Sequence, residues 1–422
     1  MLDITIICAA DLHLGRQVGP FLKNSFSILA WEKLIETCLQ KNLIIDALLL
    51  AGDVIDSDDL FIEMYGILKK GIKKLLENDI KVIAIAGNHD PQVLNQIQKS
   101  LDVPGFHLLG RNGDWERLTL NIKGKNLHID GISFTNAIME SNPFDKYKLT
   151  YPPKTEPLIG LLHCDVGVSS SKYGPVLATD FYKMEHNAWI LGHIHIPKQI
   201  SSRPLVHYCG SLQGLDISEQ GSHGALMLTI TQSNVITIKP LPLAPLRWEY
   251  LSIDLSNFSL DDWESRLFQE IENQLIQQIQ SENDHLEVVG LRLTLKGRTQ
   301  IFRELRSNLK KIEDQESSGF YLNGKWISYF IESIQNETKP LYDLERLAEG
   351  SDFAGTLAKK LLNFKKSPLG TTSTIFKHLE SRYQKDPALK QCPESWLTAE
   401  EAEELFLFKG YELLDELLEQ RH

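Results

Sequence analysis

Residues 82–90 read VIAIAGNHD, and residues 47–56 read ALLLAGDVID. Each stretch opens with five apolar residues and then passes, through a glycine, into polar side chains. Uninterrupted apolar runs of this length are typical of strands covered on both faces, and such strands belong to α/β architectures. Ligands of α/β proteins gather beyond the carboxyl ends of the strands. The two stretches therefore predict an α/β fold that carries its chemistry at strand ends.

Further apolar runs extend this pattern over the first 240 residues. They predict strands at 4–10, 127–132, 158–162, 188–191, 205–209 and 225–230. Helical patterns at 26–42, 60–78 and 91–99 separate the first strands. The later strands follow one another without helices between them. We therefore expect a mixed arrangement of strands and not a purely parallel sheet.

Three prolines, at positions 240, 242 and 245, mark a domain boundary, because proline cannot continue a central strand. Beyond them, strands are predicted at 248–255, 287–295 and 326–334, with helices at 260–280 and 301–315 between them. From residue 340 the pattern is helical. The predicted domains are a main domain of residues 1–240, a small α+β domain of residues 246–338, and a helical C-terminal region of residues 340–422.

The last predicted helix runs from 398 to about 420 and is amphipathic. Leu407, Tyr411, Leu414 and Leu418 recur on one face of it. This face either packs on the preceding helices or lies in a groove of a partner protein.

Composition bounds the class of protein. A chain of 422 residues, 42% hydrophobic and 24% charged, is expected to be a soluble globular protein of more than one domain. It has no apolar run long enough to span a membrane, and its N-terminus does not resemble a signal peptide. Its cysteines, at 8, 38, 164, 209 and 392, form no CxxC pair. Reduced thiols in the cytoplasm are therefore expected.

The net charge of −12 argues against tight nucleic-acid binding by the chain alone, since phosphate binding usually leaves a basic footprint. The segment from Glu394 to Arg421 contains nine carboxylates and two basic residues, which give it a net charge of −7. Over half of the excess charge thus lies in one C-terminal segment. A partner protein is expected.

Five segments carry the candidate chemistry, and each follows a predicted strand. They are Asp11 and His13; Asp53 and Asp56; Asn88, His89 and Asp90; His163; and His193 and His195. Five of the thirteen histidines lie in these segments. Carboxylate, imidazole and amide ligands without thiolate suit Mn²⁺, Fe²⁺ or Zn²⁺. In an extended segment, residues separated by one position point to the same side, so Asp11 pairs with His13 and His193 with His195.

Taken singly, each segment has an ordinary explanation, such as a helix cap, a turn or a hydrogen-bonded core histidine. All five in this order, each after a strand, favour two divalent cations that clamp a phosphate and activate water. We expect seven ligands: Asp11, His13, Asp53, Asn88, His163, His193 and His195.

The pattern DxH, GDxxD, GNHD, H and GHxH resembles the calcineurin-like metallophosphoesterase superfamily. Within it, the chain resembles DNA double-strand-break repair nucleases of the SbcD and YhaO type. Residues 11–15 (DLHLG), 192–198 (GHIHIPK) and 209–211 (CGS), with Glu219 and Gly221, carry the closer likeness. The resemblance covers residues 3–240 by motif and 246–335 by arrangement. It implies a β-sandwich flanked by helices, a small capping domain and a two-Mn²⁺ site.

The resemblance also implies roles. One ion would take Asp11, His13, Asp53 and His195, and the other would take Asp53, Asn88, His163 and His193, so that Asp53 bridges them. His89 would act on the scissile phosphate, and Asp90 would orient His89. Asp56 stands where part of the family has histidine. We expect a capping or supporting carboxylate there and no catalyst.

Three functions remain open at this stage. The favoured one is a DNA exonuclease or endonuclease that works in DNA repair with a coiled-coil, SbcC-like ATPase subunit. A homodimer is left open as well. The second is a small-molecule phosphatase or cyclic-nucleotide phosphodiesterase, which needs the same metal site. The third is a non-catalytic scaffold subunit, and the complete ligand set argues against it.

Overall fold

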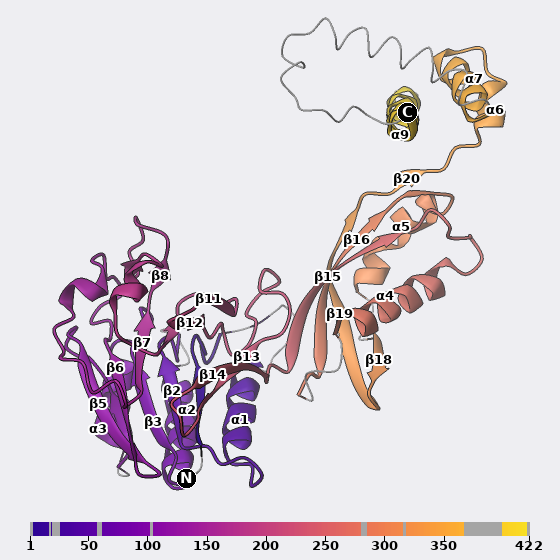
Figure 1. The fold of residues 1–422 in the computed structure, drawn as a ribbon. Coiled ribbons are helices and arrows are strands. Elements are labelled where there is room, and N and C mark those ends of the chain that lie inside the picture. The colour runs from indigo at the N-terminus through magenta and orange to yellow at the C-terminus, as the bar shows by residue number, and fades with distance from the viewer. Residues whose placement is uncertain are drawn as a thin grey trace, which may run out of the picture. The chain divides into compact units, whose positions relative to one another are not determined.

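The structure is a computed structural model that describes residues 3–16, 18, 26–56, 61–101, 104–279, 285–314, 318–366 and 399–419. Its first part contains two six-stranded sheets (Figure 1). In order across the first sheet, the strands are Ile236–Pro242 (β14), Gly224–Ile230 (β13), Ile4–Ala9 (β1), Ala47–Ala51 (β2), Lys81–Ile85 (β3) and Phe106–Leu108 (β4). β1 to β4 are parallel, and β13 runs antiparallel to β1.

The second sheet is also mixed. Its strands, in order, are Lys198–Ser202 (β11), Leu205–Tyr208 (β12), Ala188–Gly192 (β10), Leu158–His163 (β7), Lys125–Gly131 (β6) and Glu116–Ile122 (β5). The four middle strands are parallel. Asp165–Val166 (β8) and Pro175–Val176 (β9) form a separate short pair, and two 3-10 helices span Pro143–Lys146 (η1) and Asp180–Lys183 (η2).

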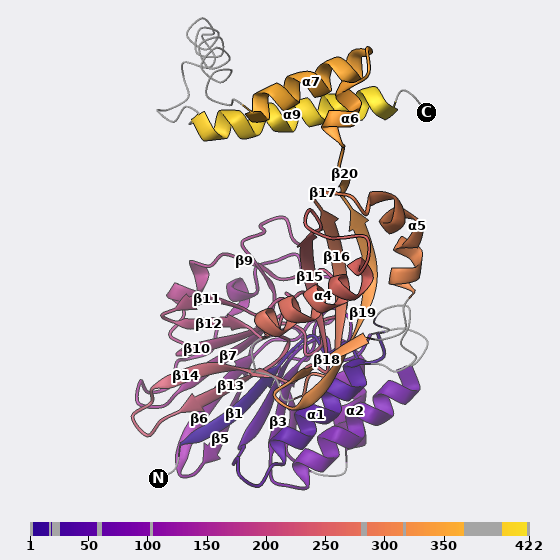
Figure 2. The same cartoon turned by 90° about the vertical axis from the view of Figure 1, so that its right-hand side faces the viewer.

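The two sheets pack face to face around an apolar core. In β1, Ile6 and Cys8 face the second sheet, whereas Ile7 and Ala9 face a layer of helices. The alternation follows from the pleat of the strand. The helical layer consists of Phe26–Cys38 (α1), Phe61–Leu76 (α2) and Val93–Ser100 (α3) (Figure 2). The predicted α/β class, a β-sandwich flanked by helices, is confirmed.

The proline-rich stretch differs from its prediction. Pro240 and Pro242 lie inside β14, opposite Leu226 and Gly224 of β13. β14 is the outermost strand of its sheet, where a residue without an N–H costs no ladder hydrogen bond. The argument that proline ends a strand therefore holds only for central strands. The division of domains at residue 240 stays a prediction.

A third sheet of four strands follows. Across it lie Leu246–Asp254 (β15), Val288–Lys296 (β16), Lys325–Asn336 (β19) and Ser318–Leu322 (β18). The helices Trp263–Ile279 (α4) and Phe302–Glu313 (α5) alternate with the parallel strands, as predicted. β18 was not predicted. It precedes Asn323 and Gly324, both with positive φ, which form the two-residue hairpin turn that Asn-Gly favours.

Contacts divide the chain into two compact units. The first comprises residues 1–254, 262–296 and 306–337, and the second comprises residues 255–261, 297–305 and 338–422. The second contains Arg298–Thr299 (β17), Lys339–Pro340 (β20), Leu344–Ala348 (α6), Phe353–Lys366 (α7) and Ala399–Glu419 (α9). The four-stranded sheet thus shares its unit with the two larger sheets.

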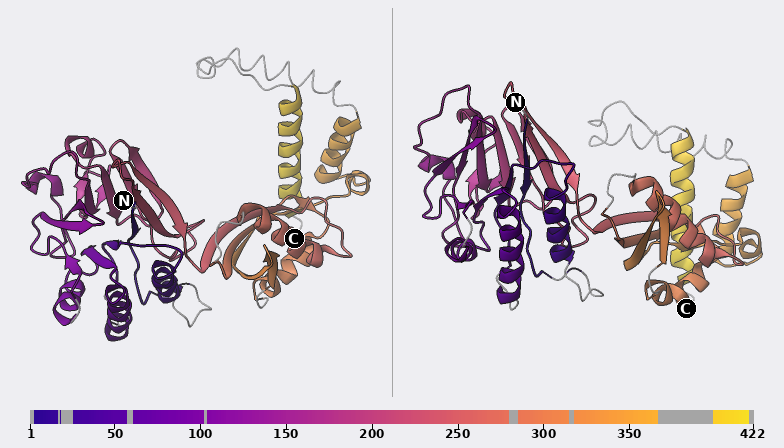
Figure 3. Two further views of the ribbon diagram at one scale, coloured as in Figure 1. Left: turned by 60° about the horizontal axis from the view of Figure 1, so that its bottom comes forward. Right: turned by 90° about the horizontal axis from the view of Figure 1, so that it is seen from below.

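Within the second unit, α9 runs alongside α7 (Figure 3). Tyr411 and Leu414 are buried in one apolar cluster with Ala358 and Leu361 of α7. Asp415 accepts hydrogen bonds from the Nη2 atom of Arg298 at 2.7 Å and from the Tyr342 hydroxyl at 2.8 Å. The apolar stripe of the last helix therefore packs on the preceding helices, which is one of its two predicted roles.

Over the described part of the chain, none of the helices combines the length and the apolar character that crossing a membrane requires. The four cysteines that the structure describes, Cys8, Cys38, Cys164 and Cys209, are buried thiols without a disulfide.

Candidate metal centre

Five strand ends meet at one edge of the sandwich. β1, β2 and β3 are parallel, so Asp11, Asp53 and Asn88 all follow carboxyl ends at the same edge of the first sheet. β7 and β10 bring His163 and His193 to the matching edge of the second sheet. Backbone contacts join the two edges. The N–H of His193 donates to both carboxylate oxygens of Asp11, at 2.9 and 3.0 Å.

The backbone at these strand ends is left-handed where the sequence predicted extended segments. Asp11, His13, Asp53 and His193 have φ of 50°, 42°, 52° and 97°. Residues other than glycine adopt such angles at a cost, and they cluster at functional sites. Asp11 and His13 do lie together, but a pair of tight turns produces this proximity. Hydrogen bonds from the N–H of Asp11 to the Gly52 carbonyl and from the N–H of His13 to the Asp53 carbonyl hold the turns.

Glycine is required where Gly87 passes Asp53. A Cβ atom at position 87 would lie 2.1 Å from Oδ1 of Asp53 and 2.7 Å from its backbone nitrogen. Side chains cannot approach so closely, so any other residue would displace the carboxylate. The glycine in GNHD thus lets two strand ends touch.

The site holds overlapping groups of metal donors. Ligand atoms of Asp11, His13 and His195 lie within 4.8 Å of one another, and so do those of Asp11, Asp53 and His163. His13 Nε2 is 3.2 Å from His195 Nε2. His163 Nε2 is 3.0 Å from Asn88 Oδ1 and 3.3 Å from Asp53 Oδ2.

The His193 ring also lies in this cluster, because its centroid is 5.3 Å from that of the His163 ring. The structure therefore brings all seven predicted ligands to one place. Oxygen and nitrogen donors without sulfur fit divalent cations such as Mn²⁺ or Zn²⁺.

Hydrogen bonds on the side away from the donor cluster fix the orientation of two of the imidazole rings. His163 donates from Nδ1 to the Ala51 carbonyl at 2.9 Å, which leaves Nε2 directed at Asp53. The Nδ1 atom of His195 lies 2.7 Å from Oε1 of Glu219. Such hydrogen bonds set the tautomer of a metal-ligating histidine. Glu219, nearly buried, also accepts from the Ser211 hydroxyl and from the N–H of Leu215.

Sequence reasoning used Glu219 and Ser211 only as marks of resemblance and missed their position behind His195. No spacing rule connects residues 195 and 219. The CGS motif at 209–211, directly after the β12 strand, was the available signal.

Asp56 contacts two histidines of the site, as expected of a supporting carboxylate, whereas Asp90 does not have the position that sequence reasoning assigned to it. Oδ1 of Asp56 lies 3.0 Å from Nδ1 of His89 and 3.1 Å from Nδ1 of His13. Asp90 is fully buried and accepts backbone N–H groups of Val54 and Gly87, at 2.6 and 2.8 Å. The prediction that Asp90 orients the His89 ring is therefore wrong. Asp90 holds together the two loops that carry Asp53 and Asn88, and Asp56 supports His89.

Burial and charge govern the protonation of the cluster. Burial lowers the pKa of His163, but the neighbouring Asp53 carboxylate outweighs it and raises that pKa to about 9. Burial and the nearby His163 lower the pKa of His193 to about 3. Burial raises the pKa of Asp90 to about 6, with Asp53 adding to the effect. The buried carboxylates thus need a positive charge beside them, which a proton on His163 or a divalent cation can supply.

The sequence profile of the calcineurin-like phosphoesterases matches residues 4–197. The uncharacterized metallophosphoesterase YhaO of Bacillus subtilis is 27% identical over 271 residues, which cover 60% of this chain and 64% of that protein. The SbcD component of the nuclease SbcCD from Staphylococcus epidermidis is 26% identical over 271 residues, which cover 57% of this chain and 70% of that protein.

The DNA double-strand break repair protein Mre11 of Methanopyrus kandleri is 20% identical over 231 residues, 51% of each chain. The chain thus spans between half and 70% of the lengths of these curated relatives. A solved dimetal phosphatase from Danio rerio is 10% identical, with a TM-score of 0.37, over 55% of this chain and 94% of its own.

The matched region contains all five strand ends described above, from Asp11 to His195. Residues 4–197 thus form a calcineurin-like phosphoesterase domain.

Proposed function

We propose that this protein is a metal-dependent phosphodiesterase that cuts DNA, as an exonuclease or endonuclease in DNA repair. The observation that carries the proposal is the meeting of seven nitrogen and oxygen donors with an accessible imidazole, His89, beside them. The side chain of His89 is 40% exposed, whereas those of His13 and His163 are buried. One histidine is thus open to substrate while the others face inward.

The proposed metals are two divalent ions, with Mn²⁺ favoured. Two donor groups that share Asp11 fit two neighbouring ions, and Asp53 lies between His13 and His163 with Oδ2 at 3.9 and 3.3 Å from their Nε2 atoms. Asn88 and His193 complete the set. Such a pair of cations supplies positive charge to the phosphate and lowers the pKa of water.

His89 is proposed to act on the substrate, either stabilising the transition state or giving a proton to the leaving oxygen. The Asp56 carboxylate at 3.0 Å holds its Nδ1, which leaves Nε2 for the substrate. The hydrogen bond to Asp56 outweighs burial and raises the pKa of His89. A protonated imidazole is suited to both roles.

Substrate choice separates DNA cleavage from the competing small-molecule phosphatase. Incubation of the purified protein with Mn²⁺ and linear duplex DNA is expected to shorten the DNA, and chelation by EDTA is expected to stop the reaction. Cyclic nucleotides, p-nitrophenyl phosphate and a chromogenic phosphodiester are tested in parallel. Efficient hydrolysis of a cyclic nucleotide or monoester with intact DNA would reject the nuclease proposal and favour the small-molecule phosphatase. Metal binding without turnover of any of them would favour the scaffold.

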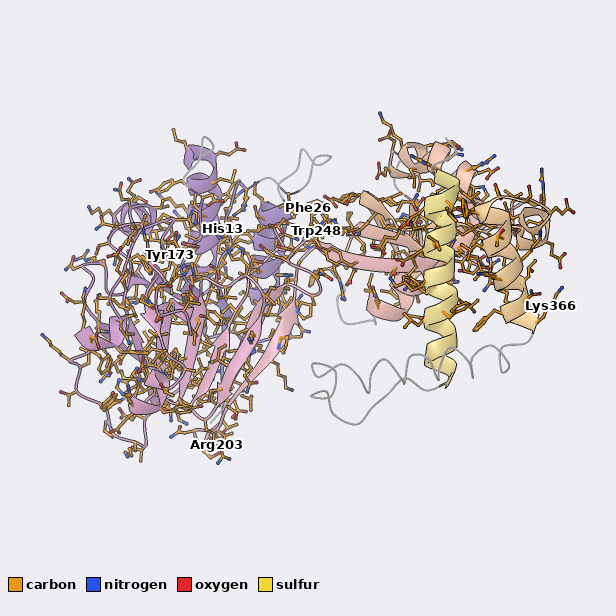
Figure 4. All side chains as sticks on the ribbon, turned by 90° about the horizontal axis from the view of Figure 1, so that it is seen from above. His13, Phe26, Tyr173, Arg203, Trp248 and Lys366 are labelled. Carbon is orange, nitrogen blue, oxygen red and sulfur yellow. The ribbon has the colours of Figure 1, made fainter. Side chains whose placement is uncertain are left out.

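The four-stranded sheet is proposed to help position duplex DNA. Deleting it is a poor test, because Trp248 of β15 is buried in one cluster with Val18 and Phe26 (Figure 4). Removal would expose this cluster. Trp326 of β19 is 52% exposed, and its replacement by alanine leaves the cluster intact. In the assay above, Trp326→Ala should slow cleavage of long duplex more than that of a small diester. Equal rates for wild type and variant on both substrates would reject this role.

A coiled-coil ATPase subunit is proposed as the partner, docked through the second unit. Because Tyr411 and Leu414 pack on α7, the docking face has to be the outer face of α9. There Phe408 is 58% exposed and Leu413 is 47% exposed, between acidic residues such as Glu412. Apolar anchors with an acidic rim fit a groove on a basic partner surface.

The double substitution Phe408→Glu and Leu413→Glu is therefore expected to abolish co-purification with the ATPase while thermal stability stays near that of wild type. Leu414→Glu is the contrasting variant, because a charge in the α7–α9 cluster should unfold the unit. Retained binding by the folded double variant would exclude this face. A homodimer is also proposed, and light scattering of the free protein measures it.

A further inference from the structure

A cavity of about 720 Å³ opens directly beside His89. It is lined by Asn88 and His89, by residues of the segment 91–96 that leads into α3, and by the loop 135–138. Tyr173 is also in the lining, and its ring contacts that of the predicted ligand His193. The volume lies within the range of sites that hold small molecules. A group attached to a phosphate at the metal centre would reach it.

The walls of the cavity are tied to the metal centre. The N–H of Phe134 donates to the Ala86 carbonyl at 3.0 Å, which fixes the loop to the end of β3. Met139 is bonded in both directions to the segment that carries Tyr173, through Lys172 O at 2.8 Å and the N–H of Gly174 at 2.8 Å. Hydrogen bonds thus tie one wall of the cavity to the end of β3, which carries Asn88 and His89, and tie that wall to the segment of Tyr173.

The lining of the cavity differs chemically from the site beside it. It contains no aspartate, glutamate, lysine or arginine. Three exposed amides, those of Gln92, Gln96 and Asn136, offer donors and acceptors together. Ile138, 52% exposed, and Val93 add apolar surface. Apart from His89 beside the metal centre, the lining offers a phosphate no cationic side chain, whereas a neutral heterocycle with a hydrogen-bonding edge would find partners for both its edge and its faces.

Tyr173 supplies an aromatic surface in the part of the cavity beside the metal centre. Its ring centroid lies 4.9 Å from that of His193, with the planes inclined by 39°. The side chain is exposed, and Figure 4 labels its position. Contact with His193 fixes the ring next to the metal centre. Planar bases stack on such rings, and stacking tolerates any base because all have a π face.

We propose that this cavity binds the nucleobase of the nucleotide adjoining the scissile phosphate, by stacking on Tyr173 and hydrogen bonding to the amides of Gln92, Gln96 and Asn136. The inference rests on the proposed function in one respect, that a phosphodiester is held at the metal centre. It adds that the enzyme recognises the base as well as the backbone. A base swung out of a duplex or at a frayed end is the form that fits.

The test compares three chromogenic diesters that share a leaving group: the p-nitrophenyl esters of thymidine 5′-phosphate and thymidine 3′-phosphate, and methyl p-nitrophenyl phosphate. With Mn²⁺, one thymidine ester is expected to have a kcat/KM about tenfold above that of the methyl ester, the size of one stacking contact. The ratio should fall towards one in Tyr173→Ala and in Gln96→Ala, chiefly through KM. Tyr173→Phe keeps the ring and should keep the ratio. Lys99→Ala, an exposed residue of α3 outside the lining, is the matched control.

Binding gives a readout that does not depend on turnover. Calorimetry should show tighter binding of thymidine monophosphate than of inorganic phosphate, and Tyr173→Ala should remove the difference while metal content stays that of wild type. A ratio near one for both esters in the wild type, or a ratio unchanged in Tyr173→Ala and Gln96→Ala, would overturn the proposal. Absence of hydrolysis of every ester would instead count against the proposed function, and the binding measurement would still decide whether the cavity holds a base.

Discussion

Asp53→Asn is expected to lose most bound metal and to lower DNA cleavage by about a thousandfold or more. Oδ2 of Asp53 lies 3.3 Å from His163 Nε2 and 3.9 Å from His13 Nε2, so its carboxylate lies between one histidine of each proposed donor group. An amide in its place keeps the shape but removes the charge that two cations would share. Elemental analysis of the purified variant measures the metal, and the rise in Tm on adding Mn²⁺ should disappear with it.

Asp79→Asn is the matched control. Asp79 also has a left-handed backbone, with φ of 61°, which asparagine adopts as readily, but it lies exposed in the turn after α2. This variant should bind metal and cleave DNA like the wild type. Full metal occupancy with near-normal cleavage in Asp53→Asn would remove Asp53 from the ligand set.

His89→Ala is expected to keep both metals and to lower kcat by about a hundredfold to ten-thousandfold, the usual contribution of a positioned acid or base. The reason is geometric. The Nδ1 atom of His89 is held by Asp56, and His89 belongs to neither donor group built on Asp11, although it forms a separate close group with His13 and Asp56. His107→Ala, a half-buried histidine of β4, is the control for loss of an imidazole.

Asp56→Asn tests the same arrangement through the carboxylate that holds the His89 ring. It should reduce kcat less than His89→Ala does, and the double variant should be no slower than His89→Ala alone, because both residues act through one imidazole. If His89→Ala lost metal in proportion to activity, His89 would be a ligand. If the two effects added in full, Asp56 would act independently, through its contact with His13.

The sequence predicts the sandwich well because its strands are marked locally. Runs such as 47–51 and 82–86 are apolar throughout, and strands buried on both faces leave little other interpretation. β4 was missed because it is only three residues long, and β5 and β11 were missed for the converse reason. β5 and β11 lie at sheet edges and are exposed along much of their length, so their sequences lack a sustained apolar run. The edge strand β14 was misjudged because a proline there costs nothing.

In the candidate site, too, some features could be predicted from the sequence and others could not. The donor types, their order and their position after strands follow from the sequence by itself, because parallel strands place their carboxyl ends at one edge whatever the loops between them do. The tertiary structure alone decided which carboxylate supports His89. Asp90 is adjacent in the chain, yet its carboxylate turns inward to Val54 and Gly87, whereas Asp56, from another loop, reaches the ring. Adjacency in sequence does not set side-chain direction in a turn.

The last helix shows that the sequence also does not predict what covers an apolar helix face. Its period predicts an apolar face, but a period carries no information about what covers that face. Only the packing of Tyr411 and Leu414 against Leu361 of α7 assigns the stripe to the interior. The cavity beside His89 has no sequence signature either, since residues 92, 136 and 173 come from three separate loops. The sequence determined which chemistry gathers at the strand ends, and the tertiary structure decided which side chains stand next to it, because those contacts depend on loop directions that no local pattern encodes.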